Sequence, residues 1–444
     1  MSESGQDVDT KNYKRRKFQN GDVERNIIKN LPDTMLLHIL SFLPAKDVLK
    51  TSILSKRWRH LWMSVSNLDF EEWIADKRTL FLTSAERAMM WRDVPKIEKF
   101  SIACEVLDGA CRINALISNA LCFKVQDLSL VLDNGSETFM LPHHLFFCPT
   151  LTALKLQITD NFQLPSTTCF PNLNELKLSF CIFSDEQSIL QFFGGCPKLQ
   201  KLTLNECEWG DAKFVCISTP MLESVVICDV NWGGGCQVVI SGAKVKSFSY
   251  SGELKTNYCL YSSSSIIDAC IEVRSKSSIE RERREREAAY RVHKLIMECC
   301  NVKSLVLSPD TIEILAYAEE LDLPVFPRLT HLKLKRKCID LSCRALHKLL
   351  QKLPHLECLD FGMGIFLSKK HKNFIWDPMP PCLLTKLKTI KIHTFSATDK
   401  ELHAVRILFS ISTVLEKMYI SGGWLNQNEI SKLPRKSTCE IIYT

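Results

Sequence analysis

A short pattern of apolar residues recurs along the chain from Ile97 onward. In each copy, the first, fourth and sixth residues of a hexapeptide are apolar. The copies are IEKFSI from Ile97, VQDLSL from Val125, LTALKL from Leu151, LNELKL from Leu173, LQKLTL from Leu199, LESVVI from Leu222, VKSFSY from Val245, VKSLVL from Val302, LTHLKL from Leu329, LECLDF from Leu356, LKTIKI from Leu387 and LEKMYI from Leu415. Because side chains alternate across a strand, positions four and six face one side and positions three, five and seven the other. Each copy predicts a short strand with one buried face.

The spacing of the copies indicates the architecture. Apart from one step of 57 residues, successive copies begin 22 to 31 residues apart. A period in the twenties with an L-x-x-L-x-L core is typical of leucine-rich repeats. A single repeat cannot bury its own apolar side, so stacked neighbours share one core and form a curved parallel sheet. The predicted fold class is therefore α/β, with a leucine-rich-repeat solenoid over residues 97–375.

The 57-residue step is about twice the usual one and predicts a further repeat, IIDACI from Ile266. It is followed by a charged segment in which Val292, Leu295, Ile296 and Cys299 recur at helical spacing. We expect a helix whose second half packs on the sheet. The charges from Glu280 to Glu287 fit either a solvated face with i,i+4 ion pairs or a binding element.

Residues 27–70 show a different, helical pattern. Leu36, Ile39, Leu40 and Leu43 mark one face of a first helix, which Asp33 could cap and Pro44 ends. A second helix is predicted over Ala45 to Leu54, and a third follows Ser55. The remaining inward-facing or apolar positions are Val48, Leu49, Ile53, Trp58, Leu61 and Trp62. Such a short segment seldom buries enough surface to fold alone, so its apolar faces predict a partner.

Composition narrows the class of protein. The 444 residues include 57 basic and 50 acidic ones, and a net charge of +7 does not impose nucleic-acid binding. The N-terminus lacks the apolar core of a signal peptide, and we expect an intracellular protein in the nucleus, the cytoplasm or both. None of the 20 cysteines forms a Cys-x-x-Cys pair, so we expect free, mostly buried thiols and neither a metal nor another cofactor. Cys148, Cys196 and Cys300 precede repeat cores, and Cys181 and Cys207 follow them, where a thiol can hydrogen-bond the turning backbone.

Two segments flank the helical pattern. Residues 1–26 are polar and predict a disordered tail. Its basic run Lys14, Arg15, Arg16 and Lys17 is either a nuclear import signal or part of a solvated tail. Residues 71–96 show weak helical spacing and predict a connector to the solenoid.

The helical segment resembles the F-box. Leu31 and Pro32 match its opening, Ile39, Leu40 and Leu43 its middle, and Ser52, Leu54, Ser55, Arg57, Trp58 and Trp62 its end. Residues 376–444 resemble the FBD region that follows F-box and leucine-rich repeats in a large plant family. The matching residues there are Trp376, Pro381, Cys382, Leu383, Leu387, Phe395, Leu402, Leu415 and Lys417.

The resemblance implies a non-catalytic subunit of an SCF (Skp, cullin, F-box) ubiquitin ligase. The F-box would dock a Skp-type adaptor that bridges to a cullin, and the repeats would bind an unknown protein substrate. The residues expected to dock the adaptor are Leu31, Pro32, Leu36, Ile39, Leu40, Leu43, Leu54, Trp58 and Trp62. Two alternatives stay open: a leucine-rich-repeat scaffold or inhibitor outside any ligase, and a nucleic-acid-binding regulator.

A row of cations falls on the outward positions of the predicted strands: Lys155, Lys177, Lys201, His331, Lys333, Lys335, Lys391, His393 and Lys417. Such a row could attract an acidic or phosphorylated target or a polyanionic small molecule. It could equally keep an exposed sheet soluble. Ser224, Ser247, Ser249 and Ser251 interrupt the row and argue against one uniform phosphate track.

Overall fold

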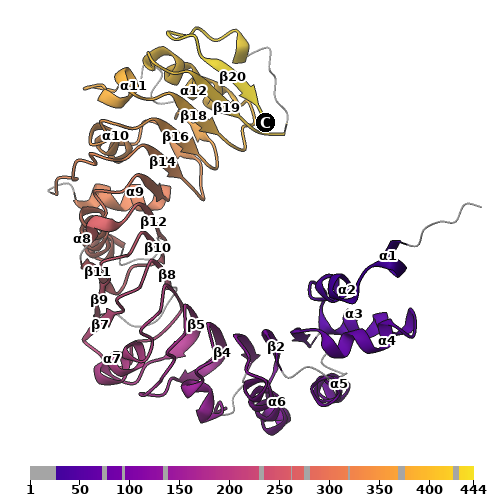
Figure 1. Ribbon diagram of the computed structural model, residues 1–444. Coiled ribbons are helices and arrows are strands. Elements are labelled where there is room, and N and C mark those ends of the chain that lie inside the picture. The colour runs from indigo at the N-terminus through magenta and orange to yellow at the C-terminus, as the bar shows by residue number, and fades with distance from the viewer. Residues whose placement is uncertain are drawn as a thin grey trace, which may run out of the picture.

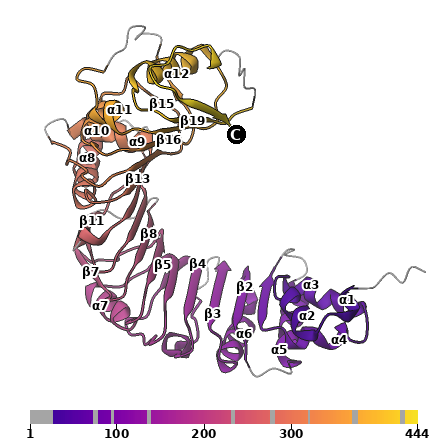
Figure 2. The same ribbon diagram turned by 45° about the horizontal axis from the view of Figure 1, so that its top comes forward.

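The computed structural model describes residues 27–72, 78–92, 96–133, 139–229, 235–261, 263–274, 281–318, 321–368, 376–423 and 430–444. The chain forms an open arc, with small helices at the N-terminal end and the C-terminus at the other end (Figure 1). In both views a large sheet lines the inner side of the arc, and helices and short strands cover the outer side (Figure 2). The predicted tail and its basic run lie outside the described residues.

The main sheet has 15 strands, and every neighbouring pair is parallel. In spatial order, its strands are β1 (Asn67–Glu71), β2 (Lys99–Glu105), β3 (Asp127–Asp133), β4 (Ala153–Gln163), β5 (Glu175–Ile182), β6 (Lys201–Asn205), β8 (Ser224–Asp229), β10 (Ser247–Gly252), β12 (Asp268–Val273), β13 (Ser304–Leu307), β14 (His331–Leu334), β16 (Cys358–Phe361), β18 (Thr389–Ile392), β19 (Lys417–Ile420) and β20 (Glu440–Tyr443). This order follows the chain, as expected of a solenoid in which each repeat contacts its neighbours.

The predicted repeats agree with these strands. Each hexapeptide supplies a strand of the main sheet, and the additional repeat from Ile266 forms β12, so the long step spans two repeats. Strands β1 and β20 at the two edges were not predicted. The segment VSNLDF from Val65 carries the hexapeptide pattern of β1 but was assigned to the helical module, and the segment of β20 lacks an apolar first residue. The sheet thus begins at Asn67, inside the segment assigned to the helical module.

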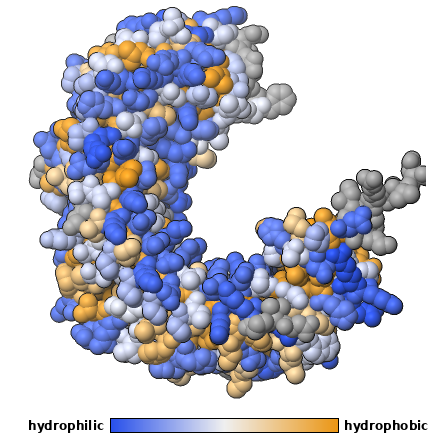
Figure 3. Space-filling model, in the orientation of Figure 1, coloured by the Kyte–Doolittle hydropathy of each residue, from blue (hydrophilic) through white to orange (hydrophobic). Residues whose placement is uncertain are grey.

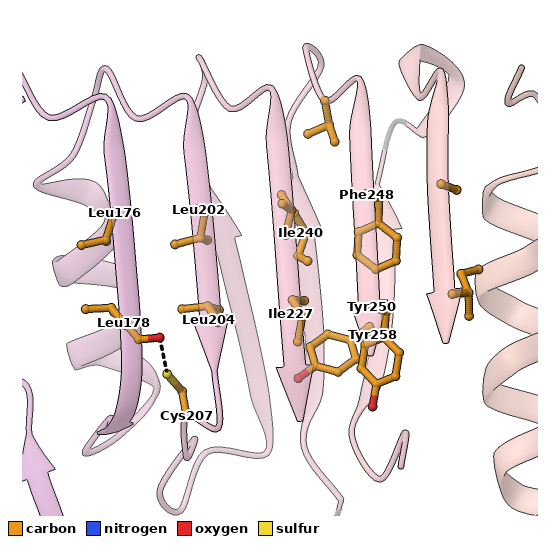
Figure 4. Packing of buried hydrophobic residues seen from close by; sticks show 14 of the residues in the cluster. Leu176, Leu178, Leu202, Leu204, Cys207, Ile227, Ile240, Phe248, Tyr250 and Tyr258 are labelled. Atoms are coloured by element: carbon orange, nitrogen blue, oxygen red, sulfur yellow. Dashed lines mark hydrogen bonds between the residues drawn. The ribbon is translucent and has the colours of Figure 1, made fainter. Parts of the chain in front are cut away.

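The core is a ladder of aliphatic side chains on the outer-facing side of the main sheet. Leu176, Leu202, Val225 and Phe248 are register partners on consecutive strands, and each is at most 1% exposed. Figure 4 shows the leucines of β5 and β6 stacked in this way. Burying one such side chain contributes roughly 1.5–3 kcal/mol, so adjacent repeats stabilise one another.

The outer side of the arc carries two smaller parallel sheets and most of the helices. The small strands are β7 (Phe214–Ser218), β9 (Gln237–Ser241) and β11 (Asn257–Tyr261) in one sheet and β15 (Ile339–Asp340) and β17 (Ile365–Phe366) in the other. The helices of the solenoid are α5 (Arg78–Met90), α6 (Ala110–Cys122), α7 (Glu186–Gly194), α8 (Arg281–Glu298), α9 (Pro309–Leu315), α10 (Arg344–Gln351), α11 (Pro381–Thr385) and α12 (Asp399–Ile411), with short 3₁₀ turns at Leu107–Gly109, His143–Phe147, Ser263–Ser265 and Ala316–Ala318.

Helices α5 and α8 correspond to two predictions. The connector is helical over α5, which packs on α6. Helix α8 buries Val292, Leu295 and Ile296 completely, so the second half of the charged segment packs as expected. Among the described residues, no helix combines the length and the apolar character needed to cross a membrane.

The cysteines are all free thiols. Several hydrogen-bond nearby backbone carbonyls: the Sγ of Cys207 lies 3.6 Å from the Leu178 oxygen (Figure 4), and that of Cys196 lies 3.6 Å from the Phe192 oxygen. The Cys181 Sγ donates to the Ser179 oxygen at 3.4 Å. These contacts confirm that thiols at the repeat turns hydrogen-bond backbone carbonyl groups.

One buried carboxyl gives the solenoid a pH dependence that can be measured. Tyr258 donates its hydroxyl to Asp229 Oδ2 at 2.7 Å, but burial outweighs this bond and raises the pKa of Asp229 to about 6 from 3.8. The folded state therefore holds this proton more tightly than the unfolded state. The carboxyl's contribution to stability is fully present below about pH 4 and is lost as the pH rises through 6.

We expect Asp229→Asn to reveal this contribution, since asparagine can still accept from Tyr258 but carries no charge. Thermal unfolding of both proteins from pH 4 to pH 7 should show the wild type losing about 2 kcal/mol relative to the variant as the pH rises. Parallel stability curves across this range would contradict the assignment.

Candidate adaptor-binding and target-binding surfaces

The N-terminal module consists of very short helices joined by tight turns. They are α1 (Ile27–Asn30), α2 (Asp33–Leu40), α3 (Ala45–Lys50) and α4 (Trp58–Leu61), with 3₁₀ turns at Thr51–Ile53 and Trp62–Ser64. Arg57 ties the third segment to the first, because its guanidinium donates to Asp33 Oδ1 and to the Leu31 carbonyl oxygen. Asp33 was expected to cap α2, but it is the first residue of that helix and binds Arg57 instead.

The structure divides the residues expected to dock the adaptor into two groups. Leu36 and Leu40 are 0% exposed and Trp62 is 8% exposed. Their side chains form the module's own core and offer a partner almost no surface in the chain alone. The other members are half-buried or exposed: Leu31, Pro32, Ile39, Leu43, Leu54 and Trp58.

Besides Ile28 of α1, which is 54% exposed, three exposed apolar residues of the module were missing from that prediction. Met35 and Phe42 are 50% and 74% exposed, and they lie four residues before and three after Ile39, on one face of α2 and the turn that follows it. Ile53 was expected to point inward but is 86% exposed, because the second helix ends at Lys50 and a 3₁₀ turn rotates Ile53 outward. Met35, Ile39 and Phe42 follow an i, i+4, i+7 spacing, which the sequence alone could have revealed.

We call Met35, Ile39, Phe42, Leu43, Ile53 and Leu54 the apolar surface of the module. Each is at least 37% exposed although each is a large hydrophobic residue. Hydrophobic residues gather on this end of the arc in Figure 3. Exposed apolar residues concentrated in so small a module are characteristic of a protein interaction site.

The second candidate surface is the inner face of the main sheet. Lys155 and Lys177 are direct register partners, as are Lys333, Asp360 and Lys391 across the three strands β14, β16 and β18. His331 and Lys201 occupy the neighbouring row, two residues earlier on their strands. The predicted cations therefore share one face, as expected.

Acidic residues interleave with these cations, which the sequence pattern did not reveal. Lys177 lies 2.8 Å and Lys201 4.0 Å from Glu175. Farther along, Asp360 lies 2.9 Å from Lys333 and 3.3 Å from His393. Lys391 lies over the Tyr419 ring at 5.6 Å. The row is a set of local ion pairs and does not form one continuous positive track.

Charge also changes along the arc. The first three strands present the acidic residues Asp69, Glu71, Glu105, Asp127 and Asp133. Lys99 is the cation beside them, 3.6 Å from Asp127. Cations lie on β4 to β6 and again from β14 onward, so the face is acidic at its first three strands and carries cations interleaved with carboxylates farther along. A target that spans this face needs the opposite order of charges.

The described residues offer no candidate metal centre. They contain no group of three or more His, Cys, Asp or Glu side chains able to hold a metal ion. His143 and His144 lie exposed on a 3₁₀ turn. The apolar surface and the inner sheet face can bind proteins, and they are the features that call for a functional explanation.

The C-terminal region is built into the solenoid. Trp376 is 3% exposed, donates its indole N–H to the Leu341 oxygen at 3.2 Å and stacks on His347. Cys382, Leu383 and Leu387 are fully buried behind β18. Thr398 and Glu401 form a capping box at the start of α12. The residues that resemble the FBD region thus supply the core of the last repeats.

A helical module with an exposed apolar surface, followed by a leucine-rich-repeat solenoid, defines the class of F-box proteins with leucine-rich repeats. Family models agree: the F-box domain matches residues 28–70, the leucine-rich repeats of the FBD-associated F-box protein At5g56370 match residues 114–244, and FBD matches residues 376–420. The chain belongs to the plant F-box/LRR-repeat family, in the group that also carries an FBD region.

Similar proteins from Arabidopsis thaliana match nearly end to end. F-box/LRR-repeat protein At3g59210 is 31% identical, and the match covers 89% of this chain and 87% of that protein. F-box/LRR-repeat protein At3g59190 is 29% identical, with 80% of this chain and 95% of the relative covered. F-box/FBD/LRR-repeat protein At5g56420 is 26% identical over 94% of this chain and 99% of its own length.

Proposed function

We propose that this chain is the substrate-recognition subunit of an SCF-type ubiquitin ligase. Its F-box would dock a Skp-type adaptor through the apolar surface, the adaptor would bridge to a cullin, and the inner sheet face would bind the target protein. The single observation that carries the proposal is the exposure of Met35, Ile39, Phe42, Leu43, Ile53 and Leu54 on a module whose own core is already filled. Such a surface is stabilised by a partner.

The arc supports this division of labour. The F-box lies at one end, and the sheet face that would hold the target continues from it (Figure 1). A target bound there is carried with the adaptor and the cullin, so a lysine of the target meets the ubiquitin-charged enzyme at high effective concentration. The chain itself needs no catalytic group in this scheme.

Co-purification tests the proposal. The intact chain, expressed in plant cells under proteasome inhibition, should capture a Skp-type adaptor and a cullin. Proximity labelling by the intact chain and by a chain lacking residues 28–70 should then give candidate targets, namely proteins that accumulate only when both surfaces are present. Capture of partners by the sheet face alone, with no adaptor on the intact chain, would favour a scaffold or inhibitor outside any ligase.

The acidic residues of the inner face bear on the remaining alternative. Asp69, Glu71, Glu105 and Asp133 would repel a nucleic-acid backbone along the first strands. We therefore expect no steeply salt-dependent binding of DNA or RNA by the described part of the chain. A filter-binding assay between 50 and 200 mM salt tests this expectation directly.

A further inference from the structure

Three cations converge near the centre of the inner face, where β10, β12 and β14 end. We call Arg274, Lys335 and Arg336, together with Ser251 and Glu272, the arginine site. Ser251 and Glu272 are register partners on β10 and β12. Arg274 follows the end of β12, and Lys335 and Arg336 follow the end of β14. The site was not apparent from the sequence, because its arginines lie just after the repeat hexapeptides.

Arg336 reaches this position through a left-handed backbone conformation that recurs at the same repeat turn in Phe180, Glu206 and Thr394. Its φ of +81° lies in the left-handed region, which is strained for a residue with a side chain. From there the guanidinium extends back across β13, donates through Nε to Glu272, and places Nη2 3.3 Å from Ser251 Oγ.

Arg274 approaches the same hydroxyl from the other side. Its Nη2 lies 3.5 Å from Ser251 Oγ. In the part of the chain that the structure describes, no carboxylate lies within ion-pair distance of Arg274. Lys335 lies 3.9 Å from Glu272, which is only 8% exposed and is thus held by two cations at once. The site therefore has three positive charges against the one carboxylate that contacts them.

Two guanidinium groups directed at one neutral hydroxyl repel each other, and among the described residues only the guanidinium of Arg336 has a carboxylate partner, Glu272. An oxyanion placed beside Ser251 would accept from both guanidinium groups and remove that repulsion. The Nε of Arg336 already donates to Glu272. The remaining N–H donors of this guanidinium face the exposed side of the sheet. A phosphate dianion has the charge and the three acceptor oxygens to satisfy two guanidiniums and an ammonium together.

The sheet surface beside the arginine site carries only short side chains. Ser247, Ser249 and Ser251 on β10 and Cys228 on β8 are the outward side chains there, and all are small. A peptide backbone can approach a surface of short side chains closely. Long lysine side chains at these positions would keep it away from the sheet. A phosphorylated side chain on an extended segment therefore fits this place.

We propose that the arginine site binds a phosphoserine or phosphothreonine of the target protein, so that phosphorylation of the target controls its capture. This inference rests on the proposed function, because it assigns the class of substrate that the inner face selects. Lys335 adds long-range attraction, while the two arginines supply the directional hydrogen bonds.

Fluorescence polarisation with peptide libraries tests the inference on the full chain co-purified with its adaptor. One library has a fixed central phosphoserine with degenerate flanks, and its twin has serine. The wild type should bind the phosphorylated library at least about tenfold more tightly, the factor expected for one charge-assisted hydrogen-bonding pair. Arg274→Gln and Arg336→Gln should each remove about tenfold of that affinity. Arg406→Gln, which removes an exposed arginine of α12, is the matched control and should change nothing.

Arg336→Gln leaves Glu272 without its arginine and could unfold the repeat, so Arg274→Gln decides. Equal affinity for the two libraries, or an undiminished preference in Arg274→Gln, would overturn the inference. Free O-phosphoserine that competes as well as the phosphopeptide would also overturn it, by showing a site for small phosphate esters. Adaptor retention is scored in the same samples: retained adaptor without phosphopeptide preference rejects the arginine site alone, and lost adaptor rejects the proposed function.

Discussion

The double substitution Ile39→Asp and Phe42→Asp is expected to weaken binding of a Skp-type adaptor more than a hundredfold. Both side chains are exposed in the chain alone, at 44% and 74%, so the substitutions leave the F-box core intact. Covering a large apolar side chain contributes roughly 1.5–3 kcal/mol, and two of them account for about 3 kcal/mol or more of binding free energy. Two carboxylates buried without partners would weaken the complex further.

Isothermal titration of purified adaptor into the full chain measures this effect. Met140→Asp is the control, because Met140 is 75% exposed on the solenoid and its replacement adds one carboxylate in place of an exposed apolar side chain away from the F-box. Leu40→Asp is a poor test, since Leu40 is fully buried and its replacement would unfold the module. Adaptor affinity that survives the double substitution would show that the apolar surface is not the docking site.

The second large effect concerns the solenoid, where Gly195→Ala should destabilise the repeat that contains α7. Gly195 has an ordinary φ of −71°, so its backbone conformation needs no glycine. A Cβ there would, however, lie 2.2 Å from the carbonyl oxygen of Thr168, a backbone atom that cannot rotate away. Phe170 also donates its N–H to the Gly195 oxygen at 2.8 Å, which fixes the two segments together. We expect a loss of about 3 kcal/mol, the upper range for overpacking.

Gly194→Ala provides the control one residue away. A Cβ at Gly194 would meet nothing within 4 Å, and alanine favours the helix, so this variant should gain about 0.5–1 kcal/mol. Trp209, stacked on Phe183 beside α7, reports the local transition by its fluorescence during urea unfolding. Equal midpoints for the two variants would contradict the close packing of Thr168 on Gly195.

The solenoid was predictable because its signal is repeated. Each hexapeptide places Leu, Ile or Val on the same side of a strand, and even the weaker copy from Ile266 forms β12 in register with its neighbours. The edge strands escaped prediction, because β1 follows the F-box helices directly and β20 lacks the complete pattern. An edge strand is defined by the partner that it pairs with, and one segment of sequence does not contain that information.

The two candidate surfaces were harder to predict for a physical reason. Ile39 and Leu40 are consecutive residues of α2, and the helical pattern assigns both to the same broad apolar face. The pattern therefore does not show that Leu40 faces the core and Ile39 the solvent. Ile53 was misplaced because the helix gives way to a 3₁₀ turn at Thr51. On the inner face, the lysines were found, but the pairing of Lys201 with Glu175, of Lys335 with Glu272 and of Lys333 with Asp360 depends on neighbouring strands. Pairing across repeats is a property of the register.

Titration of the intact chain with a Skp-type adaptor tests the central claim most directly. We expect saturable binding at one adaptor per chain, with micromolar or tighter affinity, and its loss when residues 28–70 are deleted. The deletion variant should keep a folded solenoid, checked by its cooperative unfolding. No binding by an intact, folded chain, or equal binding after the deletion, would contradict the assignment of this chain as a ligase subunit.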